Sequence, residues 1–130
     1  MNPAEEYEFK RQNFIENTRK CFMFLVKDFG YSEPIYKFYQ QENGTIIEDE
    51  FRFENIIVDR LLIVSNAYHP YDYGFEVNFY RPSVASSYEH REMRIYIKKE
   101  EQDLEQTYIE QAAIELRKYR EVLTGVKWFD

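Results

Sequence analysis

The chain has 130 residues, enough for one domain with its own core, and 44% of them are hydrophobic, which argues against intrinsic disorder. Acidic residues outnumber basic ones by 24 to 17. This composition argues against binding to nucleic acid or an anionic membrane, because phosphate groups require an excess of Lys and Arg. A lone cysteine, an acidic start and the lack of a long apolar run predict a cytoplasmic protein.

A helix is predicted at the start of the chain. Asn2 and Pro3 supply an N-cap and a first-turn proline, and Glu5 stands at the capping-box position. Apolar residues then recur at helical spacing as far as Phe29, and Gly30 is suited to a helix C-terminus.

The middle of the chain is predicted to form antiparallel strands. The segment Ile35–Gln40 alternates and is rich in strand-forming residues, and Asn43-Gly44 is a typical hairpin turn. The apolar run 56–64 is interpreted as one long central strand, with a turn or bulge at Asp59-Arg60 as the alternative. Further strands are expected at 45–53, 75–80 and 93–97.

The closing segment is again predicted to be helical. Asp103 with Gln106 resembles a capping box, apolar residues recur at helical spacing over 104–123, and Gly125 follows them. The apolar tail at 126–129 is expected to fold back onto the core, because an exposed tail would leave an apolar patch.

The order helix, strands, helix predicts a single α+β domain over residues 1–130. We expect an antiparallel sheet of about four to five strands in a meander, with an N-terminal and a C-terminal helix packed on one face.

The acidic excess is concentrated in the predicted sheet. Residues 35–80 carry eight acidic and three basic side chains, whereas the segments before and after them are nearly neutral. One interpretation is a solvated sheet face that discourages pairing between edges. The other is an acidic docking surface for a basic partner.

Five tyrosines lie between residues 68 and 88. Tyrosine is suited to protein interfaces because it offers a large, stiff contact area with a polar tip. Packing of these rings against the core or sheet edge is the alternative to a role in binding. The candidate partner-binding residues are Glu48, Asp49, Glu50, Tyr71, Asp72 and Tyr73.

Motifs for catalysis, cofactors and metals are not found in the sequence. Four ungrouped glycines exclude a P-loop or dinucleotide fingerprint, and no serine lies in a G-x-S-x-G elbow. His69 and His90 lack the spaced ligand set of a metal site, and Cys21 is expected to be a buried apolar side chain. We therefore expect no catalytic residue, metal ligand or cofactor.

Four short segments carry a resemblance to a known class of protein: 24–31, 53–55, 112–119 and 123–125. In this order they resemble small uncharacterised bacterial α+β proteins, which are similar to the single-domain immunity proteins that neutralise toxins delivered between competing bacteria. The resemblance implies a binding role, and it transfers no site residue. Together with the acidic sheet it leads us to expect a protein partner such as a basic toxin domain.

We therefore expect a non-enzymatic protein-binding domain. Two alternatives stay open. One is a small-molecule-binding roll of helices and sheet with an aromatic-lined pocket. The other is a self-associating protein, for example a homodimer that pairs through the sheet or an apolar helix face.

Overall fold

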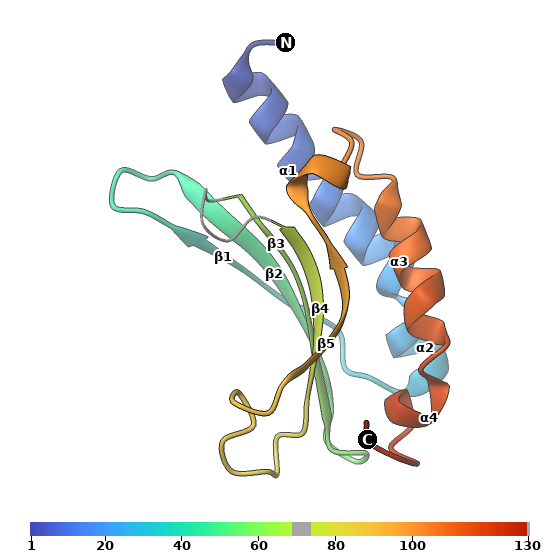
Figure 1. The fold of residues 1–130 in the computed structure, drawn as a ribbon. Coiled ribbons are helices and arrows are strands. Elements are labelled where there is room, and N and C mark those ends of the chain that lie inside the picture. Colours follow the sequence, from blue (N-terminus) through green and yellow to red (C-terminus); the bar gives the residue numbers. More distant parts are fainter. Residues whose placement is uncertain (69–73, 130) are drawn as a thin grey trace.

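The computed structural model describes residues 1–68 and 74–129, which form two layers, a sheet and a set of helices from both ends of the chain (Figure 1). The helical elements are α1 (Pro3–Phe22), α2 (Phe24–Phe29), the 3-10 helix η1 (Lys99–Glu101), α3 (Tyr108–Arg117) and α4 (Arg120–Leu123).

The sheet has five strands, each antiparallel to its neighbours, in the order of the chain. They are β1 (Ile35–Gln40), β2 (Ile46–Asn55), β3 (Arg60–Ala67), β4 (Gly74–Tyr80) and β5 (Glu92–Ile97). This meander, with N-terminal and C-terminal helices on one face, confirms the predicted α+β fold.

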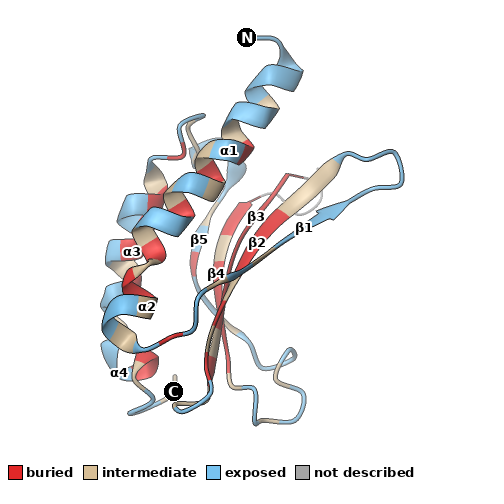
Figure 2. Cartoon of the chain, turned by 180° about the vertical axis from the view of Figure 1, so that it is seen from behind, coloured by how far each residue is buried: buried red, intermediate tan, exposed pale blue. Residues whose placement is uncertain are grey.

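The core lies between the helices and one face of the sheet, which we call the inner face; the opposite face is the outer face. Because side chains alternate along a strand, Phe51 and Phe53 of β2 both point to the inner face. Their ring centroids lie 6.0 Å from Phe14 and 6.5 Å from Phe22 of α1, respectively. Figure 2 shows the buried residues gathered where the helices meet the sheet.

The start of α1 confirms the predicted capping box. The Asn2 side chain accepts a hydrogen bond from the Glu5 amide at 2.8 Å, and the Glu5 carboxylate accepts one from the Asn2 amide at 3.2 Å. The single helix predicted to reach Phe29 is instead divided at Met23 into α1 and α2. Gly30 ends α2 with a left-handed φ of 76°, as its position predicted.

The prediction of one strand over 56–64 is wrong in its first half, and the alternative turn is confirmed. Residues 56–59 form the turn between β2 and β3, closed by a hydrogen bond from the Asp59 amide to the Ile56 carbonyl at 3.2 Å. Asp59 has a φ of 58°, a conformation that Asp tolerates better than most residues. Ile57 is 96% exposed, so the apolar run marks a loop tip.

The predicted C-terminal helix starts later than expected, at Tyr108 instead of near Asp103. The reason is Gln106, whose φ of 57° interrupts helical geometry while its buried side chain accepts a hydrogen bond from the Asn66 amide group at 3.2 Å. Asp103 accepts a hydrogen bond from the Thr107 amide at 2.9 Å.

The C-terminal segment returns to the core through Trp128 and Phe129, as predicted. Val126 of the same tail is exposed. Arg60 at the start of β3 holds this segment by donating from Nε to the Val122 carbonyl at 2.7 Å and from Nη2 to the Lys127 carbonyl at 2.9 Å. Gly125 lies between these carbonyls with a φ of 78°, directly against Val58.

Replacing Gly125 with alanine is expected to destabilise the domain, because alanine is strained at this φ and its Cβ would lie 2.7 Å from the Val58 Cβ. Gly44→Ala is the matched control, since Gly44 has a φ of 88° and nothing within 4 Å of an added Cβ. We expect a loss of about 1 kcal/mol for Gly44→Ala and roughly 1–3 kcal/mol more for Gly125→Ala in urea unfolding. Equal losses would contradict the role of the Val58 contact.

Candidate functional site

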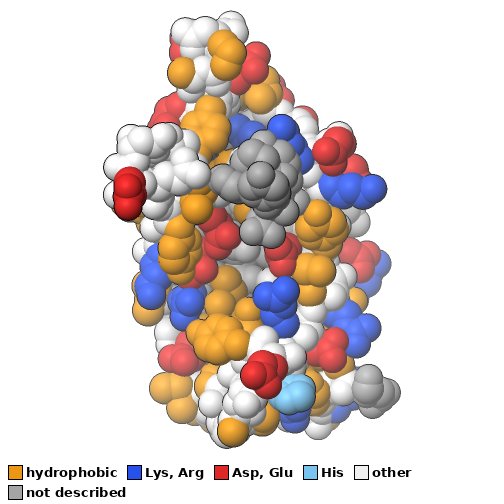
Figure 3. Space-filling model, turned by 60° about the vertical axis from the view of Figure 1, so that its left-hand side comes forward, with side chains coloured by type: hydrophobic (Ala, Val, Ile, Leu, Met, Phe, Trp, Pro, Cys, Tyr) orange, Lys and Arg blue, Asp and Glu red, His pale blue; other side chains and the backbone are white. Residues whose placement is uncertain are grey.

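None of the described helices lies over the outer face of the sheet. This face is flanked at its two ends by the β1–β2 hairpin and by the loop 81–91, both of which extend away from the helix layer (Figures 1 and 2). In its central row Glu50 pairs with Ser65, and Ser65 with Glu76, on three neighbouring strands. Figure 3, which brings this side forward, shows acidic, basic and hydrophobic side chains adjoining one another.

Glu50 lies on the floor of the outer face and is only 5% exposed. Its carboxylate accepts hydrogen bonds from Arg52 Nε at 2.7 Å and from the Tyr39 hydroxyl at 3.1 Å. Burial, followed by the adjacent Glu50 charge, raises the pKa of Tyr39. The Glu50 charge is therefore already partly compensated within the chain.

A second acceptor-rich group lies on β4. The Asn78 amide group donates to the Glu76 carboxylate at 3.1 Å, while the Asn78 Oδ1 atom is buried and accepts no hydrogen bond from the described residues. The floor between β2 and β4 therefore holds the Glu50 and Glu76 carboxylates and the Asn78 oxygen, which are acceptors suited to the N–H groups of Arg and Lys.

Exposed rings and a thioether surround this floor. Tyr96 is 48% exposed and Tyr88 is 60% exposed, and Tyr39 and Met93 are also exposed. The Tyr88 ring, from the loop 81–91, packs on Tyr80 with ring centroids 5.1 Å apart. Tyr and Met are enriched in protein interfaces, so this surface has the composition of a binding site for a protein.

The structure divides the predicted partner-binding residues between two places. Glu48 and Glu50 lie on the outer face, whereas Asp49 lies on the inner face and is fully buried. The folded domain therefore cannot present Asp49 to a partner, and Glu50 offers little of its surface. Tyr71, Asp72 and Tyr73 lie outside the described residues.

Asp49 is the centre of a buried polar cluster on the inner face, which we call the Asp49 cluster (Arg11, Tyr36, Asp49 and Tyr68). Arg11 binds the carboxylate in a bidentate manner, with Nε 3.0 Å from Oδ2 and Nη2 2.9 Å from Oδ1. The hydroxyls of Tyr36 and Tyr68 donate to the same carboxylate at 2.5 and 2.9 Å. The cluster ties α1 to three neighbouring segments of the sheet and is structural in character.

The sequence contained a signal for this cluster. Asp49 lies two residues before Phe51 and four before Phe53 on β2, and side chains at such spacings point to the same face of a strand. Strand alternation therefore predicts that the Asp49 carboxylate faces the core. Arg11 precedes Phe14 by three residues on the buried side of α1, so it shares the apolar stripe of that helix.

The structure describes two of the three other chemical candidates, His90 and Cys21. His69 lies outside the described residues, and His90 is exposed in the loop 81–91. Cys21 is half-buried, and burial raises the pKa of its thiol. Within residues 1–68 and 74–129, no group of three or more His, Cys, Asp and Glu is placed to hold a metal ion. Over the same residues, no helix is both long and apolar enough to cross a membrane.

Comparisons with protein-family models, with curated proteins and with solved structures find no match for this chain. The case for the outer face therefore depends on its own residues.

Replacing Asp49 with asparagine is expected to destabilise the domain strongly, because it leaves the buried Arg11 guanidinium with only the exposed Glu8 carboxylate, 3.5 Å away, as a charged partner. The expected loss is roughly 3–5 kcal/mol in urea unfolding. Glu54→Gln, on the outer face of the same strand, is the control and is expected to change stability by less than about 0.5 kcal/mol. A loss below about 1 kcal/mol for Asp49→Asn would contradict the role of the pair.

Alkaline pH is expected to weaken the domain through the same cluster. Burial, followed by the hydrogen bond to Asp49, raises the pKa of Tyr36 to about 12, and burial beside Asp49 raises the pKa of Tyr68. Because unfolded tyrosine ionises at about pH 10, the unfolded state binds fewer protons above that pH. The free energy of unfolding therefore falls as pH rises from about 10 toward 12.

Urea unfolding from about pH 9 to 11 measures this effect. Tyr68→Phe removes one of the shifted groups and is expected to make the loss of stability with pH shallower. The control Tyr88→Phe alters an exposed ring and is expected to leave the slope unchanged. A wild-type slope in Tyr68→Phe would exclude that hydroxyl as a source of the pH dependence.

Proposed function

We propose that this chain is a non-enzymatic domain that binds a basic protein surface through the outer face of its sheet. The observation that carries the proposal is the exposure of Tyr88, Tyr96 and Met93 on a face that none of the described helices covers. Rings of this kind supply large contact areas at low entropic cost when a partner excludes water from them.

The charge of the outer face supports a basic partner. Four acidic residues and two basic residues project from the outer face of β1 to β4, namely Glu48, Glu50, Glu54 and Glu76 against Lys37 and Arg52. A negative field of this kind speeds encounter with a positive surface and disfavours acidic partners. Glu50 is only 5% exposed, so the more accessible Glu48, Glu54 and Glu76 carry this effect.

Recognition and affinity have different sources in this proposal. The carboxylates set the rate of association, which salt reduces by screening. The tyrosine and methionine side chains set the rate of dissociation, because their burial must be reversed before the partner leaves.

The resemblance to immunity proteins gives the proposal its specific form, in which the partner is a bacterial toxin with a basic active-site or substrate surface. The domain then neutralises the toxin by covering that surface, which requires binding and no chemistry on the part of this chain. A secreted toxin encoded beside the gene for this chain would support this form, and the absence of any toxin gene there would count against it.

Binding of the neighbouring gene product, measured by calorimetry, tests the surface. Tyr96→Ala and Tyr88→Ala are each expected to weaken binding about tenfold or more, because they remove exposed rings of the outer face. Ile114→Ala on α3 is the matched control, since Ile114 is also an exposed hydrophobic residue but belongs to the helix layer. Unchanged affinity in both tyrosine variants, or an equal loss in Ile114→Ala, would refute the outer face as the binding surface.

A further inference from the structure

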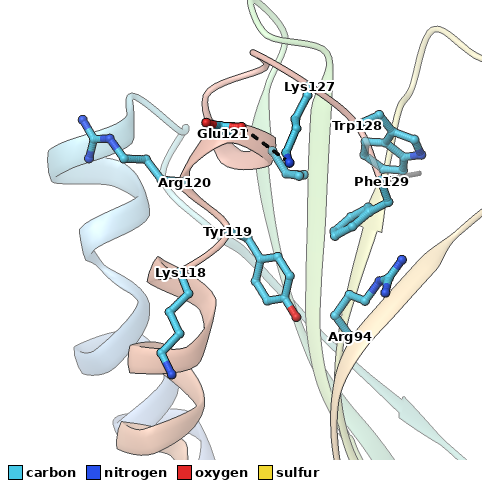
Figure 4. A pocket seen from close by; sticks show the side chains of 9 residues that line it. Arg94, Lys118, Tyr119, Arg120, Glu121, Lys127, Trp128 and Phe129 are labelled. Carbon is cyan, nitrogen blue, oxygen red and sulfur yellow. Dashed lines mark ion pairs between the residues drawn. The ribbon is translucent and has the colours of Figure 1, made fainter.

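A pocket of about 620 Å³ lies at the opposite side of the sheet, between β5, the end of α3, α4 and the C-terminal segment (Figure 4). Its volume is within the range of small-molecule sites in proteins. The side chains that bear on the argument are Arg94, Lys118, Tyr119, Lys127, Trp128 and Phe129.

Three aromatic rings form one wall of this pocket. The Phe129 ring centroid lies 5.7 Å from that of Tyr119 and 5.2 Å from that of Trp128. Phe129 also packs on the core residue Phe79, at 5.0 Å, so the wall is anchored to β4. A wall of fixed rings favours a ligand with a flat apolar part, which stacks on it or meets it edge-on.

Arg94 reaches this wall because of an irregularity in β5. The strand register shifts between Val77 and Asn78, so that Val77 pairs with Ile95 and Asn78 with Met93, and Arg94 is the extra residue of a bulge. Bulges re-aim side chains next to functional sites. The Arg94 guanidinium carbon lies 4.6 Å from the Phe129 ring centroid. Figure 4 shows Tyr119 extending from the end of α3 toward β5, and Arg94 rising from β5 beneath Phe129.

The described residues that line this pocket include four cations and one carboxylate, Glu121. The Trp128 ring contacts two guanidinium groups, Arg60 at 4.9 Å and Arg81 at 4.6 Å. Arg60 is almost completely buried, and its hydrogen bonds to described residues all go to backbone carbonyl oxygens. Arg60 does not line the pocket itself, and its charge interacts with that of Asp59, so its part is to support the Trp128 ring from behind.

Three cations at the pocket form ion pairs at the protein surface with neighbouring described carboxylates. The pairs are Arg94 with Glu92 at 3.1 Å, Lys118 with Glu115 at 2.8 Å and Lys127 with Glu121 at 3.5 Å. Surface pairs of this kind contribute little to stability, so a ligand anion can replace their carboxylates at small cost. The Arg120 side chain turns away from the pocket onto Phe29, and we assign it no role.

We propose that this pocket binds a small organic anion that carries a flat ring, such as an aromatic phosphate or carboxylate. The anionic group lies between the Arg94 guanidinium and the Tyr119 hydroxyl, and the ring lies against Phe129 and Trp128. This binding activity goes beyond the proposed protein-binding function and uses no residue of the outer face.

Trp128 is the single tryptophan of the chain, so its fluorescence reports on this pocket alone. The probe is phenyl phosphate, titrated into the full chain. We expect a saturable change in Trp128 fluorescence, with inorganic phosphate and benzyl alcohol each binding at least about tenfold more weakly, because each lacks one of the two recognised groups. No saturable change with phenyl phosphate up to about 10 mM, or equal affinity for inorganic phosphate, would overturn the proposal.

Two variants locate the binding. Arg94→Gln is expected to weaken phenyl phosphate binding about tenfold, and Tyr119→Phe, which keeps the ring, about threefold or more. Lys98→Gln is the matched control, because it removes one exposed positive charge just beyond β5 and outside the pocket lining. If Lys98→Gln lowers the affinity as much as Arg94→Gln, or if neither pocket variant lowers it, the assigned site is wrong.

Discussion

Phenylalanine side chains from two layers meet between α1 and the inner face of the sheet, and this contact places everything else in the domain. Phe14 and Phe22 project from one side of α1 onto Phe51, Phe53 and Phe75, and all five are fully buried. A sheet that buries one face in this way leaves its other face to solvent. The outer face is therefore available for tyrosine, methionine and carboxylate side chains that the core does not require.

Most of the fold could be predicted from the sequence, because helix caps and strand alternation are local signals. The capping box at Asn2 and Glu5 and the alternation at 35–40 and 75–80 identified elements that the structure contains. The prediction of one long strand over 56–64 was wrong because, in the sequence, apolar residues at a loop tip cannot be distinguished from the apolar residues of a buried strand. Only a left-handed residue, Asp59, separates the two cases, and its conformation depends on Ser83, which is distant in sequence.

The candidate sites were harder to predict, since they depend on which face each side chain takes. Glu48, Asp49 and Glu50 form one acidic run in the sequence, yet alternation sends Asp49 to the core and its neighbours to the outer face. The basic pocket gave no sequence signal, because Arg94 reaches it through a register shift between β4 and β5. The net charge of the chain also gave no indication of the pocket. The chain is acidic as a whole, whereas the charged residues that line the pocket at its C-terminal segment are mainly cations.

The attachment of the C-terminal segment to Arg60 has a consequence for biosynthesis. Arg60 lies at the start of β3, in the middle of the chain, but two of its hydrogen-bond acceptors belong to Val122 and Lys127. While the ribosome still encloses those residues, β3 holds a guanidinium group that lacks these two partners and must remain hydrated. The central strand can therefore complete its packing only after translation has passed residue 127, so the domain folds as a unit and not progressively from its N-terminus.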